Sequence, residues 1–163
     1  MTGIFYGSTT GNTEALAREI AAKLGIASSD LHDVGSASAD QVAPYDTLLL
    51  GSSTWGVGDL QDDWYEFVEA LKKENLAGKK VGLFGCGDSG SYPDSFGDAL
   101  GVIREELSGT GCTFVGEVDA SDYASTDSKA FAGGKVLGLL ADDDEPGKTP
   151  ARTETWVAAL KNA

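Results

Sequence analysis

The stretch Thr2-Gly-Ile-Phe-Tyr-Gly7, followed directly by Ser8-Thr-Thr-Gly-Asn-Thr13, decides how the rest of this sequence is interpreted. The first part is short and apolar, which predicts a buried strand. The second part carries five hydroxyl or amide side chains around Gly11, and an amphipathic pattern begins directly after it. The first N–H groups of a helix have no partner within the helix and carry partial positive charge. A strand, a polar turn and a helix in this order therefore predict an anion site.

The composition of this turn narrows the choice of anion. Residues 8–13 contain no lysine or arginine and no G-x-G-x-x-G pattern. They are therefore neither the Lys-bearing loop of nucleotide triphosphatases nor a dinucleotide fingerprint. Hydroxyl and N–H groups without a cation suit a terminal phosphate monoester. Taken alone, the same turn is also compatible with an ordinary Ser/Thr-rich helix cap.

Length and composition limit the class of protein. With 163 residues, the chain is expected to form one domain, 1–163, with a full core. No apolar run approaches the roughly 18 residues of a membrane span and no leader opens the sequence, so we expect a cytoplasmic protein. Cys86 and Cys112 form no C-x-x-C pair, which predicts neither a disulfide framework nor a metal site.

The formal net charge of −14 is the strongest compositional signal. It argues against nucleic acid and anionic membranes as partners, because both would repel the chain. It favours docking to a basic surface, with a fast and salt-sensitive encounter. Solubility, or adaptation to a salt-rich host, would explain the same charge.

Apolar strands and amphipathic helices alternate along the chain, which predicts a parallel sheet with helices on both faces. Apolar stripes and caps place the helices at 12–24, 60–71, 96–107 and from Thr149-Pro150 onward. The strands are expected at 2–7, 31–34, 45–51, 81–85 and 113–118. A polar segment, 119–130, interrupts the fifth strand before 135–141 resumes it. Five βα units would then form one doubly wound α/β domain.

Three loops at the carboxyl ends of these strands, where such sheets bind ligands, have unusual composition. They are residues 8–13, Ser52-Ser-Thr-Trp-Gly-Val-Gly-Asp59 and Cys86-Gly-Asp-Ser-Gly-Ser-Tyr92. Trp55 and Tyr92 lie in glycine-rich loops, and each alone is as compatible with packing as with binding. Two aromatic side chains on adjacent loops can cover both faces of a flat conjugated ring. Together with a phosphate loop, they predict a site for flavin mononucleotide (FMN).

Three groups of residues carry a resemblance to a known family. They are Ser8-Thr-Thr-Gly-Asn-Thr13 with Glu14, Thr54-Trp-Gly-Val-Gly58 with Leu60-Gln-Asp-Asp-Trp64, and Gly85-Cys-Gly-Asp88 with Tyr92. On these residues the chain resembles a flavodoxin over essentially its whole length. The interruption at 119–130 resembles the insertion that marks the long-chain branch, from which Gly56 and Cys86-Gly-Asp88 depart. The resemblance implies a three-layer, flavodoxin-like fold with strand order 2-1-3-4-5.

The resemblance also implies roles for individual residues. Residues 8–13 would hold the FMN phosphate, while Trp55 would cover the inner face of the ring and Tyr92 the outer face. Backbone atoms of the second and third loops would contact the polar edge of the ring. Asp144 would contact the edge or the ribityl chain of the flavin, although a solvated loop is the preferred interpretation of residues 142–145. The predicted cofactor residues are Ser8, Thr9, Thr10, Gly11, Asn12, Thr13, Thr54, Trp55, Gly56, Val57, Gly58, Cys86, Gly87, Asp88, Tyr92 and Asp144.

By the same resemblance, the expected function is that of a low-potential one-electron carrier with non-covalently bound FMN. The flavin would shuttle between its semiquinone and hydroquinone forms, and no residue is expected to be catalytic or to bind a metal. Glycine at position 56 should ease a peptide flip that offers a carbonyl to the reduced flavin. Burial between aromatic rings under an acidic surface should disfavour the anionic reduced ring, which predicts a low potential.

An acidic docking face is predicted beside the site, formed by Asp59, Asp62, Asp63, Glu66 and Glu69. The expected partners are basic redox proteins, such as a ferredoxin/flavodoxin-NADP reductase, a photosystem or a nitrogenase component. A solvated helix face would explain some of these residues equally well. The acidic surface and the lack of an exposed apolar run favour a monomer.

Two other functions are considered beside that of an electron carrier, because related folds perform them. An FMN-dependent NAD(P)H or quinone reductase on the same fold stays open as the alternative. A phospho-acceptor signalling module is disfavoured, because Ser8-Thr9 and Ser52-Ser53 stand where such modules need acidic residues. His32 is expected at the surface rather than as a ligand, and Trp64 and Trp156 are expected in the core.

Overall fold

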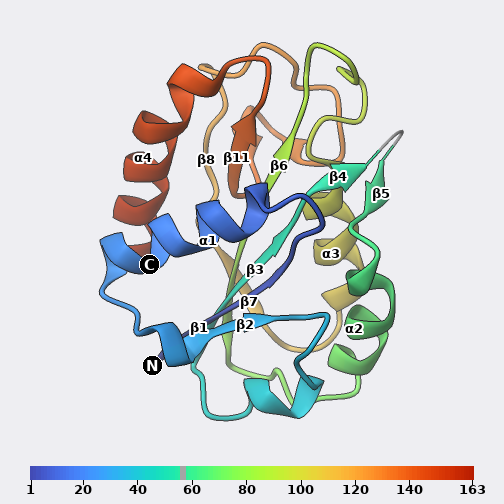
Figure 1. Ribbon diagram of the computed structural model, residues 1–163, viewed down its shortest axis with the longest axis vertical. Helices are drawn as coiled ribbons and strands as arrows, with labels where there is room; N and C mark the ends of the chain where they lie inside the picture. Colours follow the sequence, from blue (N-terminus) through green and yellow to red (C-terminus); the bar gives the residue numbers. More distant parts are fainter. Residues whose placement is uncertain (56–57) are drawn as a thin grey trace.

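The computed structural model describes residues 1–55 and 58–163, and its main sheet contains six parallel strands (Figure 1). These strands are β1 (Thr2–Gly7), β2 (Leu31–Asp33), β3 (Thr47–Ser52), β6 (Lys80–Gly87), β7 (Thr113–Val115) and β11 (Leu139–Asp142). The order is β2-β1-β3-β6, and β7 and β11 both pair with β6. Leu48, Leu49 and Leu50 of β3 are fully buried, as expected for a central strand between two layers.

The fifth position of the sheet is shared by two short strands. β7 pairs with the first residues of β6, from Lys80 to Gly82, and β11 pairs with its last residues, from Phe84 to Gly87. The predicted order 2-1-3-4-5, with an interrupted fifth strand, is therefore confirmed. Gly116 follows β7 with φ +85°, a conformation that other residues rarely adopt, and the chain leaves the sheet there.

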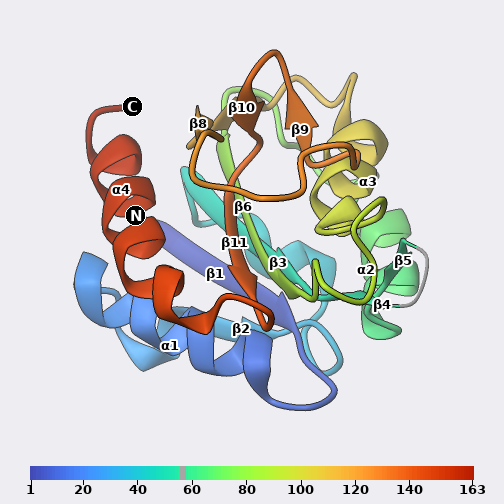
Figure 2. The same ribbon diagram turned by 90° about the horizontal axis from the view of Figure 1, so that it is seen from above.

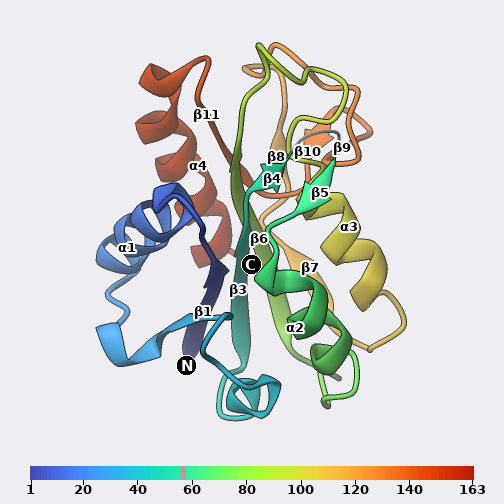
Figure 3. The same cartoon turned by 45° about the vertical axis from the view of Figure 1, so that its right-hand side comes forward.

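Two helices cover each face of the sheet (Figure 3). α1 (Asn12–Leu24) and α4 (Thr149–Lys161) pack on one face, where Ile20 and Trp156 are fully buried. α2 (Asp63–Leu71) and α3 (Asp98–Leu107) pack on the other, around Trp64. Trp64 also donates a hydrogen bond from Nε1 to the carbonyl oxygen of Gly51, 2.7 Å away. The expected three layers and the core positions of both tryptophans are confirmed.

One expected βα unit and the start of one predicted helix differ in the structure. The connection from β2 to β3 contains only a 3-10 turn, η2 (Ala39–Val42), so the expectation of five βα units was wrong. Pro44 follows this turn by two residues, and a proline inside a helix removes a hydrogen bond and clashes with the preceding turn, so the turn does not extend into a helix. Asp59 and Leu60 form β5 (Asp59–Leu60), which pairs antiparallel with β4 (Thr54–Trp55), and α2 begins only at Asp63.

The insertion in the fifth strand forms its own antiparallel sheet outside the main one (Figure 2). Its strands are β8 (Val118–Asp119), β9 (Phe131–Ala132) and β10 (Lys135–Val136), in the order β8-β10-β9. The expectation that 113–118 and 135–141 are continuous strands was therefore wrong at Val118 and at Lys135–Val136. Val118 pairs with Val136, and Lys135 pairs with Asp119, instead of with β6.

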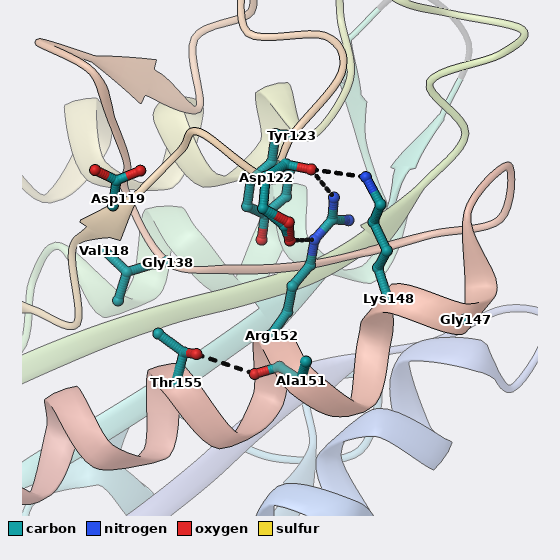
Figure 4. Close-up of a pocket in the computed structure, with 10 residues that line it drawn as sticks. All are labelled: Val118, Asp119, Asp122, Tyr123, Gly138, Gly147, Lys148, Ala151, Arg152 and Thr155. Atoms are coloured by element: carbon teal, nitrogen blue, oxygen red, sulfur yellow. Dashed lines mark hydrogen bonds and ion pairs between the residues drawn. The ribbon is translucent and has the colours of Figure 1, made fainter.

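Arg152 of α4 fastens this insertion to the rest of the fold (Figure 4). Its side chain is 4% exposed, and its Nε donates to Oδ2 of Asp122 at 2.8 Å. Its guanidinium carbon lies 3.7 Å from the centre of the Tyr123 ring. The Tyr123 hydroxyl in turn lies 3.4 Å from the N–H of Leu140 and 3.5 Å from its carbonyl oxygen. The insertion is thus held against β11, directly before the last loop of the sheet edge.

Two remaining expectations concern His32 and membrane insertion. His32 is not a free surface residue: its ring stacks on Phe5 at 4.5 Å between centroids, and Nε2 lies 2.8 Å from the Tyr45 hydroxyl. Its place on edge strand β2 explains the difference, because this side chain covers β1. Among the described residues, no helix has the length and apolar character that crossing a bilayer requires.

Candidate cofactor site

The loop after β1 leaves the N-terminus of α1 open. Gly11 is the N-cap residue with φ +93°, and a side chain added there would meet nothing within 4 Å. Within the described residues, no side chain caps this helix end. The N–H of Gly11 is held instead by the hydroxyl oxygen of Ser8, at 3.1 Å. The free N–H groups of the first turn therefore face the loop, as an anion site requires.

Thr13 adds an unsatisfied hydroxyl to the same turn. Its side chain is 1% exposed, and its Oγ1 makes no hydrogen bond of ordinary geometry with any described residue, although it lies close enough to the Cys86 thiol to interact with it weakly. A buried hydroxyl without a partner is uncommon and calls for an explanation. A phosphate oxygen at this helix end would supply the missing acceptor, so the residues present fit a phosphate group.

The second loop is braced by its neighbours. Thr54 accepts a hydrogen bond at its hydroxyl from the N–H of Ala99, 3.0 Å away, which ties the loop to the start of α3. Gln61 connects the second loop with the first, because its Nε2 donates to the Thr9 hydroxyl at 3.1 Å. The backbone N–H of Gln61 donates to the hydroxyl of Ser52 at 3.2 Å. Both loops are thus held together before any ligand is bound.

The third loop is organised by Asp88. Its Oδ1 accepts the N–H groups of Gly90, at 3.0 Å, and of Ser91, at 3.2 Å, and its Oδ2 accepts the Ser91 hydroxyl at 2.9 Å. The N–H of Tyr92 donates to the carbonyl oxygen of Asp88 at 3.0 Å. This tight turn presents the Tyr92 side chain to solvent, 46% exposed, where an aromatic ring has no core to fill.

The three predicted loops meet around one cavity of about 220 Å³ at the carboxyl edge of the sheet. Seven predicted residues line it, together with Ser53 and Asp143. The predicted residues in the lining are Thr10, Asn12, Thr54, Cys86, Gly87, Asp88 and Tyr92. No lysine or arginine is among these lining residues. Segments distant in the sequence therefore form one pocket, to which the first loop contributes polar, uncharged side chains and the later segments contribute the carboxylates of Asp88 and Asp143.

Burial and carboxylates set the charge of this pocket. Burial raises the pKa of the Cys86 thiol to about 11; the Thr13 hydroxyl opposes this rise, and the nearby Asp143 carboxylate adds to it. Burial, followed by the neighbouring Asp88 and Asp142, also raises the pKa of Asp143. The Ser91 hydroxyl and N–H, with the Gly90 N–H, lower the pKa of Asp88. The pocket thus combines a protonated thiol with an ionised carboxylate.

Several predicted residues lie away from the cavity lining. Gly58 has φ +101°, and a Cβ there would lie 2.6 Å from Oδ2 of Asp98. Asp144 is exposed, and its carboxylate lies beside Gly90. Gly56, Val57 and the side chain of Trp55 fall outside the described part of the chain.

Sequence reasoning missed four residues around the site: Ser53, Gln61, Asp142 and Asp143. Ser53 and Asp143 line the cavity, whereas Gln61 and Asp142 hold its loops in place. The run at 142–145 was recognised as acidic, but its interpretation as a solvated loop was wrong for Asp142. This residue ends β11 and is 2% exposed. Only its pairing with β6 reveals which of the four carboxylates turns inward.

The acidic residues predicted as a docking face are all exposed. Asp59 lies on β5, and the others lie at the start of α2 or along it. A groove of about 430 Å³ separates α2 from residues 34–39 and is lined by Asp62, Asp63 and Glu66. Glu69 lies farther along the helix and pairs with Lys72, with 3.5 Å between Nζ and Oε1.

This fold and site define a class of protein: a doubly wound α/β domain that holds a phosphorylated, flat cofactor at the carboxyl edge of its sheet. The sequence model of the flavodoxin family matches residues 4–156. The chain is 42% identical to a flavodoxin of Synechocystis, covering 98% of this chain and 95% of the relative. It is 43% identical to flavodoxin 1 of Escherichia coli, covering 98% and 92%.

A solved structure agrees with these relatives. The crystal structure of Fusobacterium nucleatum flavodoxin bound to flavin mononucleotide superposes with a TM-score of 0.87 at 25% identity, covering 99% of this chain and 96% of that one. This chain belongs to the flavodoxin family. Its relatives are long-chain members, and its insertion between β7 and β11 agrees with that branch.

Proposed function

We propose that this chain is an electron carrier, not an enzyme, that holds FMN non-covalently and works at low potential between the singly and doubly reduced states of the flavin. The observation that carries the proposal is the single cavity formed by three loops beside an uncapped helix N-terminus. When bound, FMN supplies the one-electron chemistry, and the protein supplies binding, orientation and electrostatics.

The residues of the chain have separate tasks in this proposal. The first turn of α1 and the Thr13 hydroxyl bind the phosphate, because they offer N–H donors that no side chain caps and a buried O–H donor without a hydrogen bond of ordinary geometry. Tyr92 covers the outer face of the ring, and Trp55 is assigned the inner face from the sequence. Asp88 and Asp143 lie on the cavity wall. A carboxylate there repels the negative charge that a second electron brings, which lowers the potential of that step.

Stepwise reduction, followed by visible absorption, tests the proposal. The purified protein should bind FMN and pass through a one-electron form with its own long-wavelength band before it bleaches. A protein that takes up no FMN would refute the proposal. Direct bleaching in one two-electron step, together with turnover of NADPH and a quinone by the protein alone, would identify the reductase alternative instead.

We further propose that Asp59, Asp62, Asp63, Glu66 and Glu69 dock basic redox partners, such as a flavodoxin-NADP reductase, a photosystem or a nitrogenase component. The groove beside α2 suits a lysine or arginine side chain, because three carboxylates line it. We infer that the chain meets such partners in the cytoplasm as a monomer.

A double variant tests the docking face. Asp62→Asn with Asp63→Asn should slow electron transfer to a basic reductase at low salt and flatten its dependence on ionic strength. The matched control is Glu105→Gln with Asp127→Asn, which removes two exposed carboxylates from α3 and the insertion. Equal effects of the two double variants would show that net charge, and not this face, governs the encounter.

A further inference from the structure

Asp142 is a buried carboxylate at the boundary between the sheet and the site. It is the last residue of β11, is 2% exposed, and lies opposite Gly87 in the parallel register with β6. The N–H of the next residue, Asp143, donates to the carbonyl oxygen of Gly87 at 2.9 Å. Asp142 therefore stands where β6 ends and the third loop begins.

Both oxygens of Asp142 are used by hydrogen bonds. Oδ1 accepts the N–H of Ser89 at 3.0 Å and the N–H of Asp144 at 3.0 Å, and Oδ2 accepts the Ser89 hydroxyl. Ser89 itself is 6% exposed. A buried carboxylate is costly unless donors satisfy it, and these donors come from two different loops. The contact therefore persists only while both loops keep their positions.

The rest of the third loop has little other support. Residues 90–94 are exposed, and Asp88 stabilises the turn from within. Among the described residues, Asp142 is the only side chain outside the loop that hydrogen-bonds to residues 88–92. Tyr92 follows Ser89 by three positions and is tied back to Asp88 through its N–H. The place of the Tyr92 ring is thus set by a short turn, which Asp142 anchors through Ser89 on one side and which leads on the other side into buried Ser95, whose N–H donates to the Tyr92 carbonyl oxygen at 3.4 Å.

We propose that Asp142 is a positioning residue, which fixes Tyr92 over the flavin by holding Ser89 in the core. The part of this inference that concerns stacking of Tyr92 on the flavin rests on the proposed function. The part that concerns anchoring of the loop rests on the structure alone. A loop held in its binding conformation loses less entropy when the cofactor binds, so the anchor increases affinity without touching FMN.

Three variants separate anchoring from charge. Asp142→Ala removes every acceptor and frees the loop. Asp142→Asn removes the charge but retains an oxygen for the two N–H groups, and its amide nitrogen can donate to the Ser89 hydroxyl. Asp94→Ala is the matched control, because Asp94 is exposed in the same connection between β6 and α3. Each variant is studied first without FMN, by amide hydrogen exchange, and then by fluorescence titration with FMN.

The expected pattern is specific to a positioning role. In Asp142→Ala, the amides of residues 89–92 should exchange faster, and FMN should bind about tenfold more weakly, the order expected for a lost hydrogen bond to a charged group. Asp142→Asn and Asp94→Ala should bind FMN within about twofold of the parent on the same basis. Ser89→Ala removes the hydrogen bond from the Ser89 hydroxyl to Asp142 and should also weaken FMN binding. This second variant keeps the inference testable if Asp142→Ala does not fold.

Three outcomes would overturn the inference. Parent-like affinity in both Asp142→Ala and Ser89→Ala would remove the link to binding. Weaker binding with unchanged exchange at residues 89–92 would show that Asp142 acts by another route. An equal loss of affinity in Asp142→Asn would assign the effect to charge. If the parent protein itself bound no FMN, the proposed function would fail, while the exchange data would still decide whether Asp142 anchors the loop.

Discussion

Removing the carboxylate of Asp122 should destabilise the protein, because it leaves the buried guanidinium of Arg152 without its main partner. The side chain of Arg152 is 4% exposed and that of Asp122 is 47% exposed, with 2.8 Å between Nε and Oδ2. Asp122→Ala therefore strips the counter-ion from a cation that water cannot readily reach. The variant tests whether the insertion is held to α4 by this pair (Figure 4).

The expected loss of stability in Asp122→Ala depends on the contacts that Arg152 retains. Breaking a fully buried pair from one side costs about 3–5 kcal/mol. Here the guanidinium retains the carbonyl oxygen of Asp122 at 3.1 Å, the Tyr123 ring at 3.7 Å and the Glu145 carboxylate at 3.9 Å. Asp122 is also half exposed, so solvent already weakens the pair. We therefore expect a loss of about 2 kcal/mol, which lowers Tm by about 4–8 °C in a chain of this size.

Thermal and urea denaturation of the apoprotein measure this loss. Asp127→Ala, an exposed carboxylate in the same insertion, is the control and should change Tm by less than about 1 °C. The double variant Asp122→Ala with Arg152→Met should be no less stable than Asp122→Ala alone, because the unpaired charge has gone. A Tm unchanged in Asp122→Ala, or additive losses in the double variant, would refute the reasoning.

Three further predictions concern the cofactor, pH and thiol chemistry. Tyr92→Ala should weaken FMN binding by about tenfold, because stacking on one ring face is lost; unchanged affinity in a fluorescence titration would exclude Tyr92 from the ring. Burial lowers the pKa of His32 from its ordinary value of 6.5, partly opposed by Asp30. The unfolded chain then binds more protons, so the free energy of unfolding should fall as pH drops through about 6.5 towards the lower folded-state value. His32→Gln should reduce this slope in urea titrations between pH 7.5 and 5.5, and an unaltered slope would contradict the assignment. Because burial raises the pKa of Cys86 to about 11, a thiol reagent at pH 8 should label Cys112 first. Labelling of Cys86 at an equal rate in the folded protein would count against its burial.

Much of the architecture followed from local signals in the sequence. Apolar strands alternate with amphipathic helices, and this periodicity alone indicated the parallel sheet and its two helical layers. The turn at residues 8–13 was recognised because its chemistry is contiguous: small polar residues, a glycine and the start of a helix adjoin one another. The interruption of the fifth strand was also visible, because polar residues separate two apolar runs.

The local signal was weaker at the ends of elements. Leu60 continues the apolar stripe of α2 by spacing, yet it pairs with Thr54 in a small hairpin. Val118 continues β7 by composition, yet it pairs with Val136 of the insertion. In both cases hydrogen bonds to another strand decided the backbone, and periodicity within one segment contains no information about such a partner.

The roles of single side chains were decided by the tertiary structure. The sequence by itself determined that an acidic run follows the last strand, but pairing with β6 turned Asp142 into the core and left Asp144 in solvent. Likewise, Arg152 looks like an ordinary helix residue until the insertion places Asp122 and Tyr123 against it. Secondary structure and the phosphate turn arise from neighbours along the chain. Burial, pKa and loop position arise from residues brought together across the sheet, and only the folded chain specifies those.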